Sequence, residues 1–156
     1  MAGGSVLAAE FAALNESIIA FTRGASPLEW RQTCVDENWA VGGVIRHIAA
    51  GYVTAVQWVD GFLEGKPIPI VQDEIDLKNH LHAAEYAKAT MPQTIDLLVA
   101  DGASVVRLIG GLSEEQLAIS HQVLPGREIT TAQLVKILIR HSQAHFDSAR
   151  GALSPR

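Results

Sequence analysis

Two histidines, His141 and His145, lie four residues apart in the closing segment of the chain, residues 130–151. At about 100° per residue, the pattern of this segment predicts an amphipathic helix with both histidines on its apolar face. A packed helix normally carries Leu or Ile there, and a buried imidazole without a partner costs about 1–3 kcal/mol. Side chains at this spacing lie one helical turn apart, which is suited to clamping one metal ion. The predicted apolar face consists of Leu134, Leu138, His141, His145, Ala149 and Ala152.

A third histidine, His47, lies near the edge of the apolar stripe of another predicted helix, and Gly51 one turn later leaves open space beside it. Three imidazoles with a free fourth position are typical of catalytic zinc, and nickel and iron are also compatible. A single histidine on an apolar face is more often a satisfied core residue than a ligand, so the pair in the last helix is the stronger indication. Ser142 stands where the metalloprotease motif needs Glu, so protease chemistry is not expected.

The remaining reactive side chains give weaker indications. His80 and His82 are two residues apart, so on a helix they do not face each other, and we interpret them as surface or loop residues. His121 is interpreted as solvated surface. Cys34 lies in a predicted loop without a flanking histidine or base, so we assign it a structural or incidental role.

The chain has 156 residues, which predicts a single domain over residues 1–156. Four long segments have helical periodicity and no segment alternates convincingly as a strand, so the sequence predicts an all-α four-helix bundle. Asn38 is the expected N-cap of the second helix, Thr90 that of the third, and Thr130 with Gln133 forms a capping box for the last. The expected helices are residues 6–23, 39–64, 90–110 and 130–151.

The connections between these helices have less regular patterns. Residues 25–38 are expected to be a loop with a short turn of helix, and residues 70–89 a short or partial helix. Ser113 begins another capping box and a short turn through Leu117. Residues 119–129 contain the turn signal Pro125–Gly126 and predict a loop or a small extended excursion.

Composition excludes several classes of protein. Hydrophobic residues make up 48% and charged residues 19%, which is typical of a globular chain. The net charge of -5 argues against nucleic-acid and anionic-membrane partners, which require clustered Lys and Arg. Cys34 is the only cysteine, so no intrachain disulfide can form and a cytoplasmic location is expected. The first residues lack the basic region of a signal peptide, and no run approaches the ~20 apolar residues of a membrane span.

Several motifs occur in a recognisable order. Trp39 is followed eight residues later by His47, and Leu124–Pro125–Gly126 precedes Ile129–Thr130–Thr131–Ala132–Gln133–Leu134 and then His141–Ser142–Gln143–Ala144–His145. Together with the Gly65–Lys66–Pro67 break and the helix start at Thr90, this order resembles the DinB-like superfamily over nearly the whole chain. The resemblance implies a four-helix bundle with a long crossover connection, which is homodimeric in many members. It also implies a site for zinc, nickel or iron with His47, His141 and His145 as ligands.

The resemblance further implies chemistry at the metal. Relatives include thiol-dependent S-transferases and a mycothiol-dependent maleylpyruvate isomerase, so we expect a low-molecular-weight thiol or water to be activated for reaction with a small-molecule substrate. The isomerase branch has a carboxylate at one ligand position of the last helix where this chain has His141, which argues against that exact activity. Neither Arg46 nor Arg140 is placed in the site, because adjacent residues on a helix point apart, and no general base is assigned. The tryptophans that would line a pocket or pack in the core are Trp30, Trp39 and Trp58.

Two other functions are compatible with the same residues. The chain would be a non-catalytic bundle if its metal only stabilised the fold, or if its groove only bound a small molecule or a partner. A site with three protein ligands is unusually open for a structural metal, which favours catalysis. A role on DNA, which only the family name suggests, is disfavoured by the net charge of -5.

Overall fold

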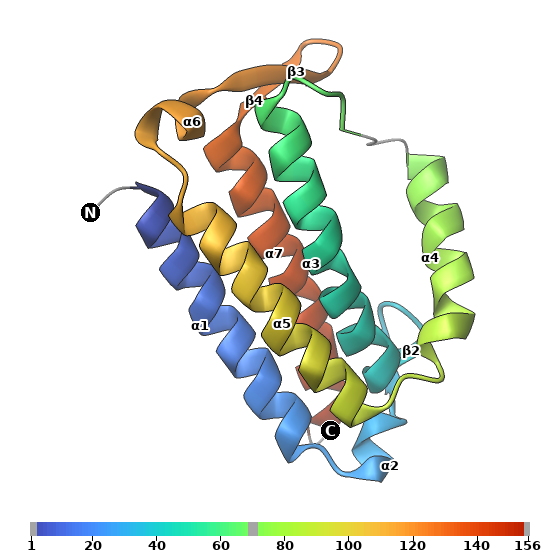
Figure 1. The fold of residues 1–156 in the computed structure, drawn as a ribbon. Coiled ribbons are helices and arrows are strands. Elements are labelled where there is room, and N and C mark those ends of the chain that lie inside the picture. The colour runs from blue at the N-terminus through green and yellow to red at the C-terminus, as the bar shows by residue number, and fades with distance from the viewer. Residues whose placement is uncertain (1–2, 69–71, 155–156) are drawn as a thin grey trace.

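Four long helices form a bundle in the computed structural model, which describes residues 3–68 and 72–154 (Figure 1). The long helices are α1 (Gly3–Gly24), α3 (Val41–Leu63), α5 (Met91–Gly110) and α7 (Thr131–Leu153). The shorter elements are α2 (Pro27–Trp30), β1 (Thr33–Cys34), β2 (Trp39–Ala40), α4 (Gln72–Tyr86), α6 (Glu114–Ala118), β3 (Ser120–Leu124) and β4 (Arg127–Thr130). The predicted all-α class is confirmed, and two small antiparallel hairpins, β1–β2 and β3–β4, are added to it.

The direction of the helices explains the long connection between α3 and α5. These two helices run the same way in Figure 1, whereas α1 and α7 run the opposite way. The chain must therefore return along the bundle after α3 before α5 begins, and α4 lies on this return path (Figure 1). This is the crossover that the resemblance implies. Helix α1 packs mainly on α5, and α3 packs on both α5 and α7, so the two histidine-bearing segments are direct neighbours.

Each long helix buries one apolar stripe in a common core. In α1 the residues that repeat at helical spacing, Leu7, Phe11, Leu14 and Ile18, are all buried, and Phe21 is partly buried against the core. Burying a large aliphatic or aromatic side chain stabilises the fold by about 1.5–3 kcal/mol. The bundle therefore holds its helices together by packing between stripes, and this packing fixes where α3 and α7 present their histidines.

Helix α1 is also the one helix in the described part of the chain whose length and composition would allow it to cross a membrane. Its most apolar 18-residue window has a mean hydropathy of 1.3. From the sequence, no apolar run long enough for a membrane span was expected. The core helix of a bundle meets the same criterion, and the apolar stripe of α1 packs against α5, so the match by itself is weak evidence for a membrane span.

One buried polar contact joins three of the long helices. The Asn15 Nδ2 of α1 donates to the carbonyl oxygen of Leu98 in α5 at 2.9 Å, and the Tyr52 hydroxyl of α3 donates to Asn15 Oδ1 at 2.9 Å. Gly102 leaves the space that the Asn15 amide occupies, since a Cβ at this position would overlap Nδ2. The glycine that weakens α5 as an isolated helix is therefore required by the packing.

The start of α3 differs from the prediction. Asn38 is not the N-cap: it has φ +56° in the turn between β1 and β2, and Ala40 caps the helix without a side-chain hydrogen bond. Trp39 belongs to β2, where it pairs with Cys34, so the helix begins two residues later than expected. The predicted loop of residues 25–38 thus contains strand β1, and also the expected short turn of helix, α2, which Ser26 caps.

The other predicted boundaries agree better with the structure. Side chains of Thr90, Ser113 and Thr130 accept the expected backbone hydrogen bonds at the starts of α5, α6 and α7. The weakly periodic segment 70–89 forms α4, although residues 70 and 71 lie outside the described part. The predicted excursion at 119–129 is the β3–β4 hairpin, and Gly126 in its turn has φ +74°.

Candidate metal centre

Three imidazoles converge where α3 packs against α7. The structure brings together His47 from α3 with His141 and His145 from α7, with one potential ligand atom from each residue within 4.8 Å of the other two. The ring centroids of His141 and His145 are 4.5 Å apart, and that of His47 lies 4.9 Å from His145 and 5.8 Å from His141. The three residues singled out from the sequence therefore form one cluster, which is compatible with metal binding.

The separation of these nitrogens suits a single divalent ion. In a tetrahedral zinc site with Zn–N bonds of about 2.0–2.1 Å, two imidazole nitrogens are about 3.4 Å apart. Small rotations of the histidine side chains would reduce the largest separation, 4.8 Å, to this value. All three ligands are neutral nitrogen donors, which zinc, nickel and iron accept.

The environment of His141 favours its neutral form. Its side chain lies at the exposed rim of the cluster, while His47 and His145 are half-buried. Desolvation of the His141 ring, and secondly the neighbouring His145, lower its pKa below the ordinary value of 6.5. A neutral imidazole keeps a lone pair for a metal, so this environment reduces the competition from protons.

A carboxylate lies behind one of the histidines. Glu37, in the turn between β1 and β2, places Oε1 at 2.7 Å from His145 Nδ1 and accepts a hydrogen bond from Ser148 Oγ on Oε2 at 2.6 Å. Since a carboxylate oxygen accepts in this contact, Nδ1 is the donor, and Nε2 is left as the ligand atom. Glu37 was not predicted as part of the site, because nothing in the segment 25–38 indicates that it reaches a helix more than 100 residues later.

Cys34 lies close to this carboxylate but has the properties of a buried thiol. Its side chain is fully buried in β1. Burial first, and then the negative charge of Glu37, raise the pKa of the thiol to about 11, although a hydrogen bond with Ser148 opposes the shift. The thiol therefore stays protonated at neutral pH, which agrees with the structural role assigned from the sequence.

Aromatic side chains cover the other side of His47. The Trp39 ring lies edge-on at 5.5 Å from the His47 ring, and the Tyr86 ring of α4 lies at 6.2 Å. The Arg46 guanidinium lies over the Tyr86 ring at 4.9 Å, so it packs on the crossover helix and does not join the histidine cluster. Together Trp39 and Tyr86 shield His47 from water and limit the positions its ring can adopt.

The remaining histidines are not part of the cluster. His80 is exposed on α4, as expected, and His82 Nδ1 lies 3.0 Å from the Tyr86 hydroxyl. His121 is not plain solvated surface, because its ring packs edge-on against Phe62 at 4.9 Å and its Nε2 is buried. Trp30 is a core residue whose Nε1 donates to the carbonyl oxygen of Ala89 at 3.0 Å, as the core-packing alternative predicts.

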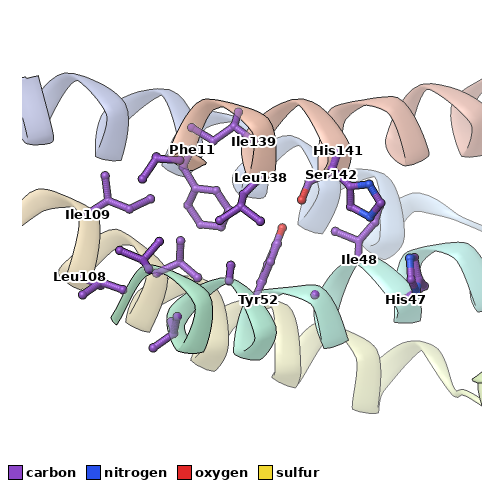
Figure 2. A pocket seen from close by; sticks show the side chains of 16 residues that line it. Phe11, His47, Ile48, Tyr52, Leu108, Ile109, Leu138, Ile139, His141 and Ser142 are labelled. Carbon is purple, nitrogen blue, oxygen red and sulfur yellow. The ribbon is translucent and has the colours of Figure 1, made fainter. Parts of the chain in front are cut away.

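A pocket extends from the histidines into the bundle core. Figure 2 shows His47 and His141 at one end of it and Phe11, Leu108 and Ile109 at the other. All four long helices contribute to its wall, which is almost entirely apolar. The centre of a water molecule can occupy ≈ 40 Å³ of it, and the unfilled space, with the open solvent at its mouth included, measures ≈ 510 Å³. None of the three tryptophans lines this pocket in the described part of the chain.

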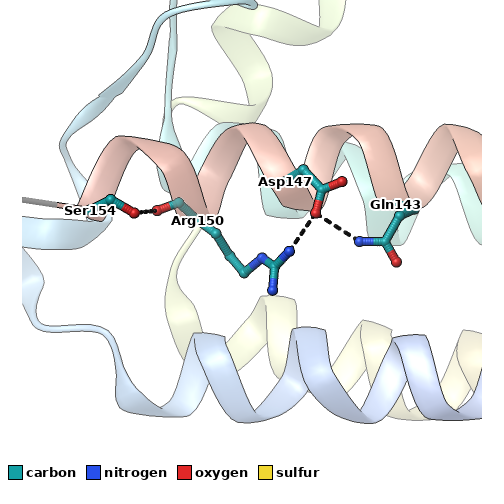
Figure 3. Close-up of polar contacts among 4 residues, drawn as sticks. All are labelled: Gln143, Asp147, Arg150 and Ser154. Carbon is teal, nitrogen blue, oxygen red and sulfur yellow. Dashed lines mark hydrogen bonds and ion pairs between the residues drawn. The ribbon is translucent and has the colours of Figure 1, made fainter.

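The opposite face of α7 is polar. Asp147 accepts hydrogen bonds from Gln143 Nε2 at 2.8 Å and from Arg150 at 2.6 Å (Figure 3), and the side chains of Asp147 and Arg150 are exposed. The Ser154 hydroxyl closes the end of this face by donating to the Arg150 carbonyl oxygen at 3.2 Å (Figure 3).

The buried face of α7 differs from the predicted one. Ser142 and Phe146 are buried, whereas His141 is exposed and His145 is half-buried, so the two histidines lie at the edge of the buried stripe, on the side of α3, and not at its centre.

Comparison with known proteins identifies the family. A search of curated proteins found no match. A family model described as the DinB superfamily matches residues 10–148, a range that contains all three histidines, Glu37 and the pocket. The matched range covers more than half of the chain and includes each long helix in part or whole. The chain therefore belongs to the DinB superfamily.

Proposed function

We propose that this protein is a metal-dependent enzyme in which His47, His141 and His145 hold one divalent ion and leave a coordination position free for a thiol or for water. The observation that carries the proposal is the convergence of three imidazoles from two helices, two of which, His47 and His141, also line one end of an apolar pocket. A cluster of this kind at the end of a pocket provides both ligands for an ion and a place for a substrate.

The bound ion would supply a Lewis acid that lowers the pKa of a thiol or water and so provides a nucleophile near neutral pH. The chain's own residues have separate roles. The three imidazoles hold the ion, Glu37 fixes the proton of His145 on Nδ1, and the apolar wall excludes bulk water from the reacting groups. These roles require no movement of a helix.

The pocket favours a thiol over water as the nucleophile. Hydrolysis of an ester or amide also needs a proton donor for the leaving group, and among the residues that the structure describes no Asp or Glu lines the pocket to supply one. A thiolate bound to a metal can attack an electrophile without a further base. We therefore favour an S-transferase, with a low-molecular-weight thiol as co-substrate, over a hydrolase.

The test combines metal depletion with single substitutions. Wild-type protein loaded with Zn²⁺, Ni²⁺ or Fe²⁺ is assayed with a panel of thiols and electrophiles, and His47→Ala, His141→Ala and His145→Ala are assayed beside it. We expect turnover in the loaded wild type, loss of at least 100-fold in each variant, and no loss in His80→Ala, whose imidazole is exposed on α4. Turnover that survives complete metal removal would exclude the proposal.

A non-catalytic role is the alternative. It predicts that chelation lowers the melting temperature strongly while no thiol or electrophile is turned over by the loaded protein.

The remaining expectations stay predictions: a homodimer, a small-molecule substrate, no nucleic-acid or membrane partner, and a cytoplasmic location. The single, fully buried free cysteine supports a reducing compartment.

A further inference from the structure

The pocket beside the histidines is elongated along α3. Its lining on this helix runs from His47 to Val59, and twelve residues of α helix span about 18 Å. The space that the centre of a water molecule can occupy in it is only ≈ 40 Å³, which over a length of about 18 Å corresponds to a narrow pocket. A space of this form suits a slender chain and excludes a bulky ring system.

Polar groups in the pocket are concentrated at the histidine end. His47, His141 and Ser142 contribute the polar atoms there, while the wall beyond them consists of aliphatic and aromatic side chains. Tyr52 also contributes to the wall, but its hydroxyl donates to Asn15. No Lys, Arg, Asp or Glu lines the pocket in the described part of the chain. A bound molecule would therefore place its polar group at the histidines and keep the rest apolar.

We propose that the substrate or co-substrate of this site carries a straight aliphatic chain, which lies in the pocket while its head group reaches the three histidines. This inference rests on the proposed function for the head group, and on the pocket alone for the chain. Each methylene that enters an apolar pocket strengthens binding by about fourfold, which corresponds to ≈ 0.8 kcal/mol. Affinity should therefore rise with chain length until the pocket is filled.

A larger side chain at Gly51 would fill part of the pocket. Gly51 lies one helical turn after His47 and lines the pocket, and a Cβ at this position would meet no atom within 4 Å. A leucine here would fill the space beside the histidines without overlapping the backbone. Gly61 is the matched control on the same helix, because it lies outside the pocket and its Cβ would make only an ordinary contact with Lys66 at 3.7 Å.

The experiment measures the binding of straight-chain alkanethiols to protein loaded with Co²⁺, whose absorption bands report thiolate coordination. From ethanethiol to hexanethiol we expect the dissociation constant to fall by about fourfold per methylene. In Gly51→Leu, the gain in affinity from ethanethiol to hexanethiol should be at least tenfold smaller than in the wild type. Gly61→Leu should match the wild type. The proposal would be overturned if the affinity for thiols did not depend on chain length, or if this dependence were the same in Gly51→Leu as in the wild type.

A second variant covers the case in which Gly51→Leu does not fold. Leu108 is half-buried at the far end of the pocket, so Leu108→Ala should extend the rise in affinity to longer thiols than in the wild type.

If wild-type protein binds no Co²⁺, the proposed function fails. The proposed binding of an aliphatic chain in the pocket is then tested on metal-free protein with straight-chain alcohols. A melting temperature that rises with the length of the alcohol would support binding of an aliphatic chain in the pocket, and a melting temperature independent of that length would overturn it.

Discussion

Glu37 determines which nitrogen of His145 faces the centre of the cluster. Its carboxyl group is held by Ser148 on one oxygen and contacts His145 Nδ1 with the other. Only 12% of the Glu37 side chain is exposed, so water competes little for this contact. A ligand whose ring is oriented in this way loses less side-chain freedom when a metal binds.

Substitution of Glu37 should weaken metal binding without abolishing it. We expect Glu37→Ala to bind Zn²⁺ about 10–100-fold more weakly, because the His145 ring loses its hydrogen-bond acceptor. Glu37→Gln should lose less, since the amide oxygen still accepts from Nδ1. The measurement is a competition titration against a chromophoric chelator. Asp36→Ala, which removes an exposed carboxylate from the same turn, is the control, and equal affinities in Asp36→Ala and Glu37→Ala would contradict the assigned role.

Cys34 should react slowly with thiol reagents. Because its pKa is raised from 9.0 to about 11, the thiolate fraction at pH 8 is about 100-fold smaller than for an ordinary cysteine. We expect the native protein to react with a disulfide reagent at least 100-fold more slowly than the same protein in denaturant. Equal rates would show that Cys34 is accessible and activated.

The raised pKa of Cys34 also affects the stability of the protein at alkaline pH. Between pH 9 and about 11 the folded state retains a proton on Cys34 that the unfolded chain releases, so the free energy of unfolding falls as pH rises through this range. Denaturant titrations at pH 8 and pH 10.5 should show this loss, and Cys34→Ala should show a smaller one. A decline of the same size in both proteins would contradict the assignment.

The helices could be predicted from the sequence because the periodicity and the capping residues that specify each helix lie within its own segment. The capping box at Thr130 lies within one segment and appears as predicted in α7, whereas the buried stripe of that helix is rotated slightly, so that Ser142 is buried and His141 is exposed. The start of α3 was not predictable in the same way. Asn38 is a good N-cap by residue type, but pairing of Trp39 with Cys34 draws it into a turn with φ +56°. Tertiary pairing overrides a capping preference of about 1 kcal/mol.

Contacts between elements account for what the sequence did not reveal at the site. Glu37 and His145 are 108 residues apart, and no residue near Glu37 indicates their contact. The same holds for Asn15, whose partners lie on α3 and α5. Such pairs depend on how the helices dock, whereas periodicity reports only which face of each helix is buried.

The buried hydrogen bonds of Asn15, which connect α1 with α3 and α5, predict an unusual response to an alanine substitution. Alanine in place of glycine normally stabilises an exposed helix by up to about 1 kcal/mol. Gly102→Ala should instead destabilise the protein by about 1–3 kcal/mol, because the new Cβ displaces the Asn15 amide and breaks its buried hydrogen bonds. The check is denaturant unfolding, with Gly151→Ala on α7 as the control, where a Cβ meets no atom within 4 Å. Stabilisation by both substitutions would show that Asn15 is free to move.

The whole bundle has a core that does not depend on the histidine cluster. Buried apolar stripes from all four long helices pack together, and the three histidines lie at one edge of this packing. A bound metal would then add stability only by mass action, by about 2.7 kcal/mol when its concentration is 100 times the dissociation constant. The fold and the proposed metal chemistry are therefore separable.

Metal-free protein should accordingly remain folded. After exhaustive chelation we expect an unchanged helical circular dichroism spectrum and a cooperative melting transition at a moderately lower temperature. Re-addition of Zn²⁺ should restore the original transition, and His80→Ala should behave like the wild type. A chain that unfolds when the metal is removed would support the structural alternative over the catalytic one.

The central claim is that His47, His141 and His145 together hold one divalent ion. Elemental analysis of the purified protein, with metal content expressed per chain, tests it most directly. We predict about one zinc, nickel or iron per chain in the wild type and in His80→Ala, and less than about one tenth of this in His141→Ala/His145→Ala. Wild-type protein without metal that also takes up none from a Zn²⁺ solution, or a double variant with an undiminished content, would contradict the claim.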